Sequence, residues 1–67
     1  MGVVAVEADL RNKLLITLEN GQKWRQIDQE YIQIKPGDSC LVKRGAIGSF
    51  LLGIEGAKKR IRVRRVD

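Results

Sequence analysis

Three arginines near the C-terminus have the type and spacing to bind a polyanion. Arg60, Arg62 and Arg64 alternate with Ile61 and Val63, and alternate residues of a β-strand point to the same face. At two residues per step, neighbouring guanidinium groups lie roughly 7 Å apart, and each can bond two oxygens of a phosphate. The spacing predicts a phosphate-binding row. Its alternative is a solvated strand whose charges discourage aggregation.

The distribution of charge favours an anionic partner. The net charge is +5, and the excess lies in residues 43–67, which hold eight Lys or Arg and two acidic residues. Lys43 and Arg44 open this basic third, and we expect them beside the arginine row. A basic surface attracts nucleic acid or another polyanion, so nucleic acid is the first partner predicted.

Trp24 is the aromatic candidate for binding. It lies between Lys23 and Arg25, an arrangement that suits stacking on a base while the basic neighbours contact the backbone. The alternative is a core tryptophan that packs opposite Ile16. We expect Trp24 to belong to the core and keep it beside that as a candidate stacking residue, half exposed at the rim of the domain.

The sequence offers no recognisable catalytic apparatus. Histidine is absent and Cys40 is the single cysteine, which removes Ser-His and Cys-His pairs, internal disulfides and most zinc sites. The acidic residues are scattered singly, without a paired, apolar setting that would raise a pKa. We therefore expect a non-enzymatic binding module with no metal and no cofactor. Cys40 is expected to be a small buried strand residue, and the loop Gly45–Ser49 to hold turn glycines, because it lacks a phosphate-loop motif.

Neither a membrane span nor a signal peptide is indicated. No apolar run approaches the roughly 20 residues that cross a bilayer. The apolar start at residues 1–6 is short and lacks a basic front, unlike a signal peptide. We expect a soluble chain whose compartment stays open; a domain excised from an exported protein would be periplasmic.

The elements that must position these residues are short strands. Segments rich in β-branched residues and separated by glycine or proline predict an all-β domain. Asp28–Ile34 is expected to be a loop or a single turn, and Lys35–Asp38 a tight turn around Pro36 and Gly37. The expected strands are Val3–Ala8, Lys13–Leu18, Lys23–Ile27, Cys40–Arg44, Phe50–Ile54 and Arg60–Val66.

The hairpin around Asn20 and Gly21 tests the register. A two-residue turn would set Ile16 opposite Arg25 and place that arginine on the apolar face. A three-residue loop with Gly21 in the left-handed region sets Ile16 opposite Trp24 instead. We expect the second arrangement, because it keeps the apolar residues on one face.

Five or six short strands in 67 residues predict one domain, a small closed or nearly closed barrel, since closure removes exposed edges. An SH3-like barrel is the first choice and an OB-like barrel the second. The expected core consists of Val4, Val6, Leu14, Ile16, Leu18, Trp24, Ile27, Leu41, Phe50, Leu52, Ile54, Ile61 and Val63.

Several of these pieces occur together in a known kind of domain. They are Leu18–Gln22 with Trp24 and Gln26, then Lys35–Asp38, Arg44–Leu52 and Ile61–Arg65. The combination resembles a small β-domain found in many uncharacterised proteobacterial proteins, often as the C-terminal part of a short exported protein. The resemblance covers nearly the whole chain and implies a bacterial β-domain, but it carries no established activity and no catalytic residues.

Two other classes of function compete with polyanion binding. One is a protein-interaction or assembly domain that uses strand-edge pairing or a strand-swapped homodimer, which small modules with a detachable end strand form readily. The other, a domain associated with the cell envelope, follows from the resemblance alone. Steep salt dependence of binding would separate the nucleic-acid hypothesis from strand pairing.

Overall fold

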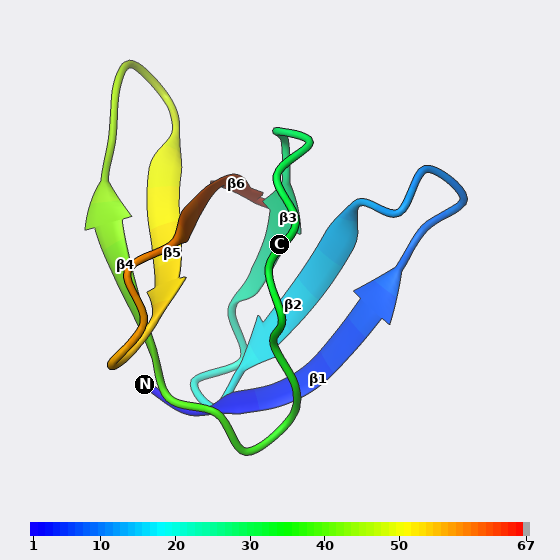
Figure 1. Cartoon of the computed structure of the whole chain (residues 1–67), viewed down its shortest axis with the longest axis vertical. Coiled ribbons are helices and arrows are strands. Elements are labelled where there is room, and N and C mark those ends of the chain that lie inside the picture. The colour runs from blue at the N-terminus through cyan, green and yellow to red at the C-terminus, as the bar shows by residue number, and fades with distance from the viewer. Residues whose placement is uncertain (67) are drawn as a thin grey trace.

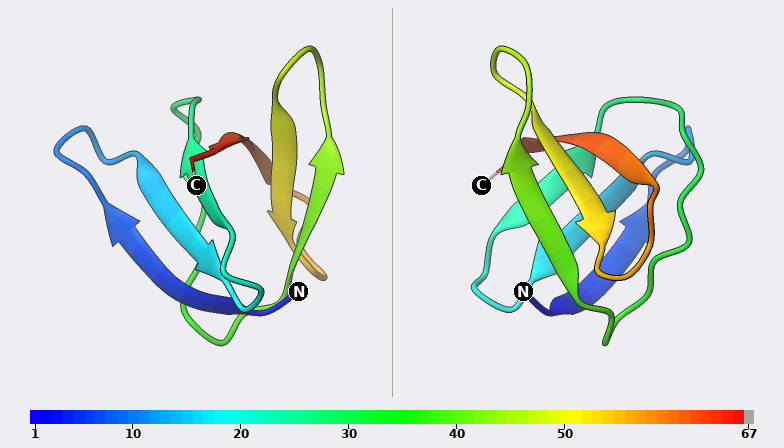
Figure 2. Two further views of the ribbon diagram at one scale, coloured as in Figure 1. Left: turned by 180° about the vertical axis from the view of Figure 1, so that it is seen from behind. Right: turned by 60° about the vertical axis from the view of Figure 1, so that its left-hand side comes forward.

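The computed structural model describes residues 1–66, and this part of the chain forms six β-strands and no helix (Figure 1). All neighbouring strands are antiparallel and belong to one sheet. Two further views show the sheet curling around an interior as a half-barrel (Figure 2), which confirms the all-β, barrel-like class. The strands are β1 (Val3–Ala8), β2 (Leu14–Leu18), β3 (Lys23–Gln26), β4 (Cys40–Arg44), β5 (Phe50–Ile54) and β6 (Arg60–Arg65).

The sheet is made of two three-stranded meanders. Its strand order is β1-β2-β3-β6-β5-β4, so that each meander contains consecutive strands and the pairing of β3 with β6 joins the two. Strands β1, β2 and β3 of one meander correspond to β4, β5 and β6 of the other: exchanging them gives the same sheet order read from the opposite edge. The topology therefore has a two-fold character. A connector, residues 27–39, links the meanders and runs across the open side of the half-barrel (Figure 1).

Closure between the edge strands β1 and β4 is limited to one end. There the N–H of Val3 donates to the carbonyl of Asp38 at 2.9 Å, and the N–H of Gly37 donates to the carbonyl of Val3 at 2.9 Å. The N–H of Cys40 donates to the carbonyl of Met1 at 2.8 Å. Beyond these bonds β1 and β4 diverge to opposite sides of the molecule (Figure 1), and an open seam separates them.

The core lies on the concave face of the sheet. Most predicted core residues are buried or half-buried there, but three are exposed: Val4 at 53%, Leu41 at 49% and Ile27 at 39%. For these three the prediction was wrong. The buried hydrophobic residues are Val3, Ile16, Leu18, Trp24, Ile32, Cys40, Leu52, Ile61 and Val63.

Strand alternation explains the three errors. A register shift lies between Val3 and Ala5, and this bulge turns Val3 inward in place of Val4. Leu41 follows the buried Cys40, so it points outward. Ile27 follows Gln26, whose side chain is buried although it is polar.

The hairpin between β2 and β3 adopts the predicted register. Ile16 pairs with Trp24, and Gly21 has a φ of 87°, in the left-handed region that favours glycine. The N–H of Gly21 donates to the carbonyl of Leu18 at 2.9 Å, and the N–H of Leu18 donates to the carbonyl of Gln22 at 2.9 Å. This three-residue loop keeps Ile16 and Trp24 on the buried face.

The connector is irregular, as expected for Asp28–Ile34, but it contributes to the core through Ile32. The predicted tight turn is present at its end. The N–H of Asp38 donates to the carbonyl of Lys35 at 3.1 Å, and Gly37 has a φ of 97°. The Asp38 carboxylate accepts the N–H of Lys35 at 3.0 Å. The connector therefore leaves β3, covers part of the interior and turns sharply into β4.

Candidate anion-binding face

The arginines of β6 point away from the core. Arg60, Arg62 and Arg64 are exposed, whereas Ile61 and Val63 are fully buried on the opposite face. This alternation is the one expected from the sequence. Because β6 lies between β3 and β5 in the sheet order, the three side chains occupy the middle of the outer sheet surface rather than its edge.

Neighbouring strands extend the basic surface sideways. Arg25 of β3 pairs with Arg64, and residues directly opposite each other on neighbouring strands project from the same face. In the other direction Arg62 pairs with Leu51, and Leu51 pairs with Lys43. Sequence reasoning did not include Arg25 among the binding residues. The predicted hairpin register, which sets Trp24 opposite Ile16 on the buried face, also places Arg25 on the outer face. This register was the sequence signal from which Arg25 could have been predicted.

Lys43 and Arg44 lie on opposite faces of the sheet. Lys43 shares the outer face with Arg62, but Arg44 pairs with Phe50 and borders a cleft on the concave side. The expectation that both would lie beside the arginine row is therefore wrong for Arg44. Adjacent residues of a strand cannot project from the same face.

Trp24 belongs to the core and not to the binding surface. Its side chain is only 4% exposed, and its ring meets that of Phe50 edge to face, with centroids 4.9 Å apart and an interplanar angle of 67°. The expectation of a half-exposed stacking residue is wrong, because Trp24 shares the inward face of β3 with Gln26. The ring is covered and offers no flat face to a base.

Gly53 allows Arg60 to lie close to β5. It pairs with Arg60, and a Cβ atom at Gly53 would lie 2.9 Å from Cγ of Arg60 and 3.3 Å from the carbonyl oxygen of Lys59. The aliphatic stem of Arg60 thus packs over the bare backbone of β5. Gly53 was not predicted from the sequence as a functional residue. The role of a glycine within a strand depends on the residue paired with it on the neighbouring strand, and that pairing is known only from the structure.

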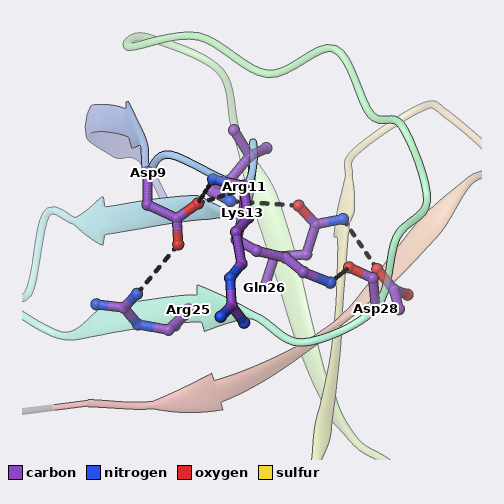
Figure 3. Close-up of polar contacts among 7 residues, drawn as sticks. Asp9, Arg11, Lys13, Arg25, Gln26 and Asp28 are labelled. Atoms are coloured by element: carbon purple, nitrogen blue, oxygen red, sulfur yellow. Dashed lines mark hydrogen bonds and ion pairs between the residues drawn. The ribbon is translucent and has the colours of Figure 1, made fainter.

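A polar cluster around Asp28 and Gln26, shown in Figure 3, contacts the main chain of β6 at Arg62. One carboxylate oxygen of Asp28 accepts the backbone N–H of Arg62 at 2.9 Å, at the point where β3 ends. The other accepts the amide of Gln26 at 2.9 Å and the N–H of Glu30 at 3.3 Å. Desolvation raises the pKa of Asp28, but these three donors and the positive charge of Lys13 together outweigh it, and the pKa is lowered from its ordinary value. The cluster fixes β6 through its main chain and leaves the Arg62 side chain exposed.

Gln26 ties together three segments of the chain in the same cluster. Its side chain is 3% exposed; its oxygen accepts the N–H of Leu14 at 3.3 Å, and its nitrogen also donates to the carbonyl of Glu30 at 2.6 Å. Lys13 adds a bond from its ammonium to the carbonyl of Asp28. Because both the oxygen and the nitrogen of this buried amide form hydrogen bonds, Gln26 holds β2, β3 and the connector in register.

The carboxylate of Asp9 balances positive charge at the edge of the basic surface. Asp9 forms an ion pair with Arg25 at 3.4 Å (Figure 3), and the N–H groups of Lys13 and Arg11 bind its other oxygen. The N–H of Lys13 is the largest cause of a lowered pKa at Asp9. Among residues 1–66 no carboxylate lies within ion-pair distance of Arg60, Arg62 or Arg64, so their charges face solvent uncompensated.

Cys40 is buried, as expected, and desolvation raises the pKa of its thiol. In residues 1–66 no group of three or more potential metal ligands occurs. The same part of the chain contains no helix that is long and apolar enough to cross a membrane.

No protein-family model, no curated protein and no solved structure matches the chain. The resemblance to the proteobacterial β-domain therefore stays a prediction from the sequence.

Proposed function

We propose that this domain binds the phosphate backbone of nucleic acid through the outer face of β6. The supporting observation is the exposed row Arg60, Arg62 and Arg64, which has no carboxylate partner among residues 1–66. Like charges held about 7 Å apart repel one another. A polyanion relieves this repulsion and gains bidentate guanidinium–phosphate bonds.

The composition of the surface supports backbone contact over base recognition. Arg25 and Lys43 flank the row, whereas Trp24 is buried and offers no stacking face. A basic face that has no aromatic side chain among its own residues contacts phosphates and reads little sequence. The domain should therefore bind duplexes of different sequence with similar affinity.

The test is a duplex-DNA titration at several salt concentrations. Neutralising about three to five phosphates gives a log-log salt slope of roughly −3 to −4. The triple variant Arg60→Gln, Arg62→Gln, Arg64→Gln keeps the chain length of each side chain and removes the charge. Its slope should shrink by about three units, while the fold survives because Ile61 and Val63 still fill the core.

A charge-matched pair of variants separates the face from net charge. Arg62→Gln with Arg64→Gln removes two charges from the face, and Arg11→Gln with Lys35→Gln removes two from exposed loop positions. The first pair should weaken binding by at least about tenfold and the second by less than about threefold. Equal losses would show that net charge alone attracts the DNA. No affinity below about 100 μM at low salt would show that the row is a solvated strand.

A further inference from the structure

The free edge of β4 presents main-chain groups in a defined direction. The N–H of Glu55 donates to the carbonyl of Ser39 at 2.8 Å, and the N–H of Gly45 donates to the carbonyl of Ser49 at 3.0 Å. Hydrogen bonding alternates along an antiparallel strand. Odd-numbered residues from 39 to 45 therefore face β5, and the N–H and C=O groups of Val42 and Arg44 face the open seam.

The first strand-like contact across this seam is already made. The N–H of Cys40 donates to the carbonyl of Met1 at 2.8 Å, and the Met1 amine donates to the carbonyl of Cys40 at 3.2 Å. This is the reciprocal pair of an antiparallel ladder. Val42 and Arg44 are the next positions of this ladder along β4. Because β4 is the last strand of the sheet order, no strand pairs with them there.

A cleft lies where the side chains of an added strand would point. Its volume is about 460 Å³, and its apolar wall is formed by Leu18, Trp24, Val42 and Phe50. The indole N–H of Trp24 is buried and has no hydrogen-bond partner within residues 1–66. Directly paired residues of an antiparallel ladder project from the same face, so residues opposite Val42 and Arg44 would enter this cleft.

The charge at the cleft selects the occupant. Arg44 borders it, and Lys43 lies next along β4 on the outer face. An acidic side chain opposite Arg44 is attracted there, and an apolar side chain opposite Val42 packs against the aromatic wall. The net charge of +5 disfavours a second copy of the chain in the same place.

We propose that the β4 seam binds an extended acidic peptide segment of a partner protein by antiparallel strand addition. The partner segment carries an acidic residue, then any residue, then an apolar residue, read from its N-terminus. The acidic residue lies opposite Arg44 and the apolar residue opposite Val42. Main-chain bonds supply affinity, and the alternate side chains supply selectivity. This surface is separate from the outer face of β6 and does not depend on nucleic-acid binding.

The test uses a capped peptide, acetyl-Thr-Glu-Thr-Val-Thr-amide, and two N-methylated forms of it. Methylation at the valine blocks its hydrogen bond to Val42, whereas methylation at the central threonine modifies an N–H that points away from β4. Fluorescence of Trp24, the single tryptophan, reports occupancy of the cleft. Valine methylation should weaken binding by at least about tenfold, and threonine methylation by less than about twofold. Equal affinity of the two methylated peptides would overturn strand addition.

A charge swap tests the role of Arg44. Arg44→Glu should weaken binding of the Glu peptide and strengthen binding of the same peptide with Lys in place of Glu; unchanged preference would overturn the assignment of Arg44. Hydrogen exchange at Val42 and Arg44 should slow only when the peptide is present. Slowing with protein concentration alone would show that a second copy fills the seam and would overturn the peptide proposal. The triple arginine variant of β6 should bind the peptide normally, which distinguishes this site from the nucleic-acid face.

Discussion

The ring of Trp24 meets the ring of Phe50 edge to face across β6, with centroids 4.9 Å apart. Trp24 lies on β3 and Phe50 on β5, so that this contact spans the strand that joins the two meanders. The same two side chains form the wall of the cleft beside β4. Packing of the two halves and the shape of the cleft therefore depend on one aromatic pair.

Replacing Phe50 should test this pair. Phe50→Leu removes the edge-to-face contact and part of the apolar wall, and should lower the free energy of unfolding by about 1–2 kcal/mol. Chemical denaturation followed by Trp24 fluorescence measures the loss. Leu41→Ala, a substitution on the outer face at a half-exposed position, should cost less than about 1 kcal/mol. Similar costs for the two variants would contradict a special role for the aromatic contact.

Gly21 should be sensitive to β-branched replacement for a purely backbone reason. Nothing lies within 4 Å of a Cβ built at this residue, and its φ is 87°. Gly21→Val should therefore cost about 1–2 kcal/mol through left-handed strain alone. Gly21→Asn should cost less, because asparagine tolerates this region. Equal melting temperatures for the wild type and the valine variant would show that Gly21 is not held in this conformation in solution.

The buried amide of Gln26 predicts a larger effect. Gln26→Met fills the same space but leaves the N–H of Leu14 and the carbonyl of Glu30 without their side-chain partner. Unsatisfied buried groups cost about 1–3 kcal/mol each, so we expect a loss of roughly 2–3 kcal/mol by thermal denaturation. Gln33→Met, at an exposed position of the connector, serves as the matched control and should change stability little. A neutral Gln26→Met would contradict the network.

Asp28 should contribute a pH-dependent part of the stability. Its pKa is lowered from the ordinary value of 3.8, so the ionised form favours the folded state. The contribution is present above the pKa of the unfolded chain and is lost as the pH falls through the lower pKa of the folded chain. Asp28→Asn should cost about 1 kcal/mol at neutral pH, and this difference should disappear in acid below the ordinary value. Denaturation at a series of pH values measures it, and a difference that persists unchanged into acid would contradict the linkage.

The sequence predicted the strands and the outward direction of the β6 arginines because both follow from local alternation. The register of the hairpin followed from one glycine and one apolar face. The inward position of Val3 could not be predicted, because the bulge between Val3 and Ala5 leaves no glycine signal. The placement of Gly53 under Arg60 depends on the pairing of β5 with β6, which the sequence does not specify. The predicted position of Arg44 was wrong because Lys43 and Arg44 are neighbours in the sequence, and strand alternation puts neighbours on opposite faces of the sheet.

The connector between the meanders has a consequence for how the chain folds and assembles. Each meander forms from contacts close in sequence, which is the fast part of folding, whereas the pairing of β3 with β6 must wait for residues 27–39 to fold back. A chain cut within the connector should therefore reassemble from two three-stranded fragments. A chain whose connector is shortened until it cannot reverse should instead exchange halves with a second chain and form a swapped dimer. The length of the connector, rather than any residue of the β3–β6 interface, then determines whether the chain forms a monomer or a swapped dimer.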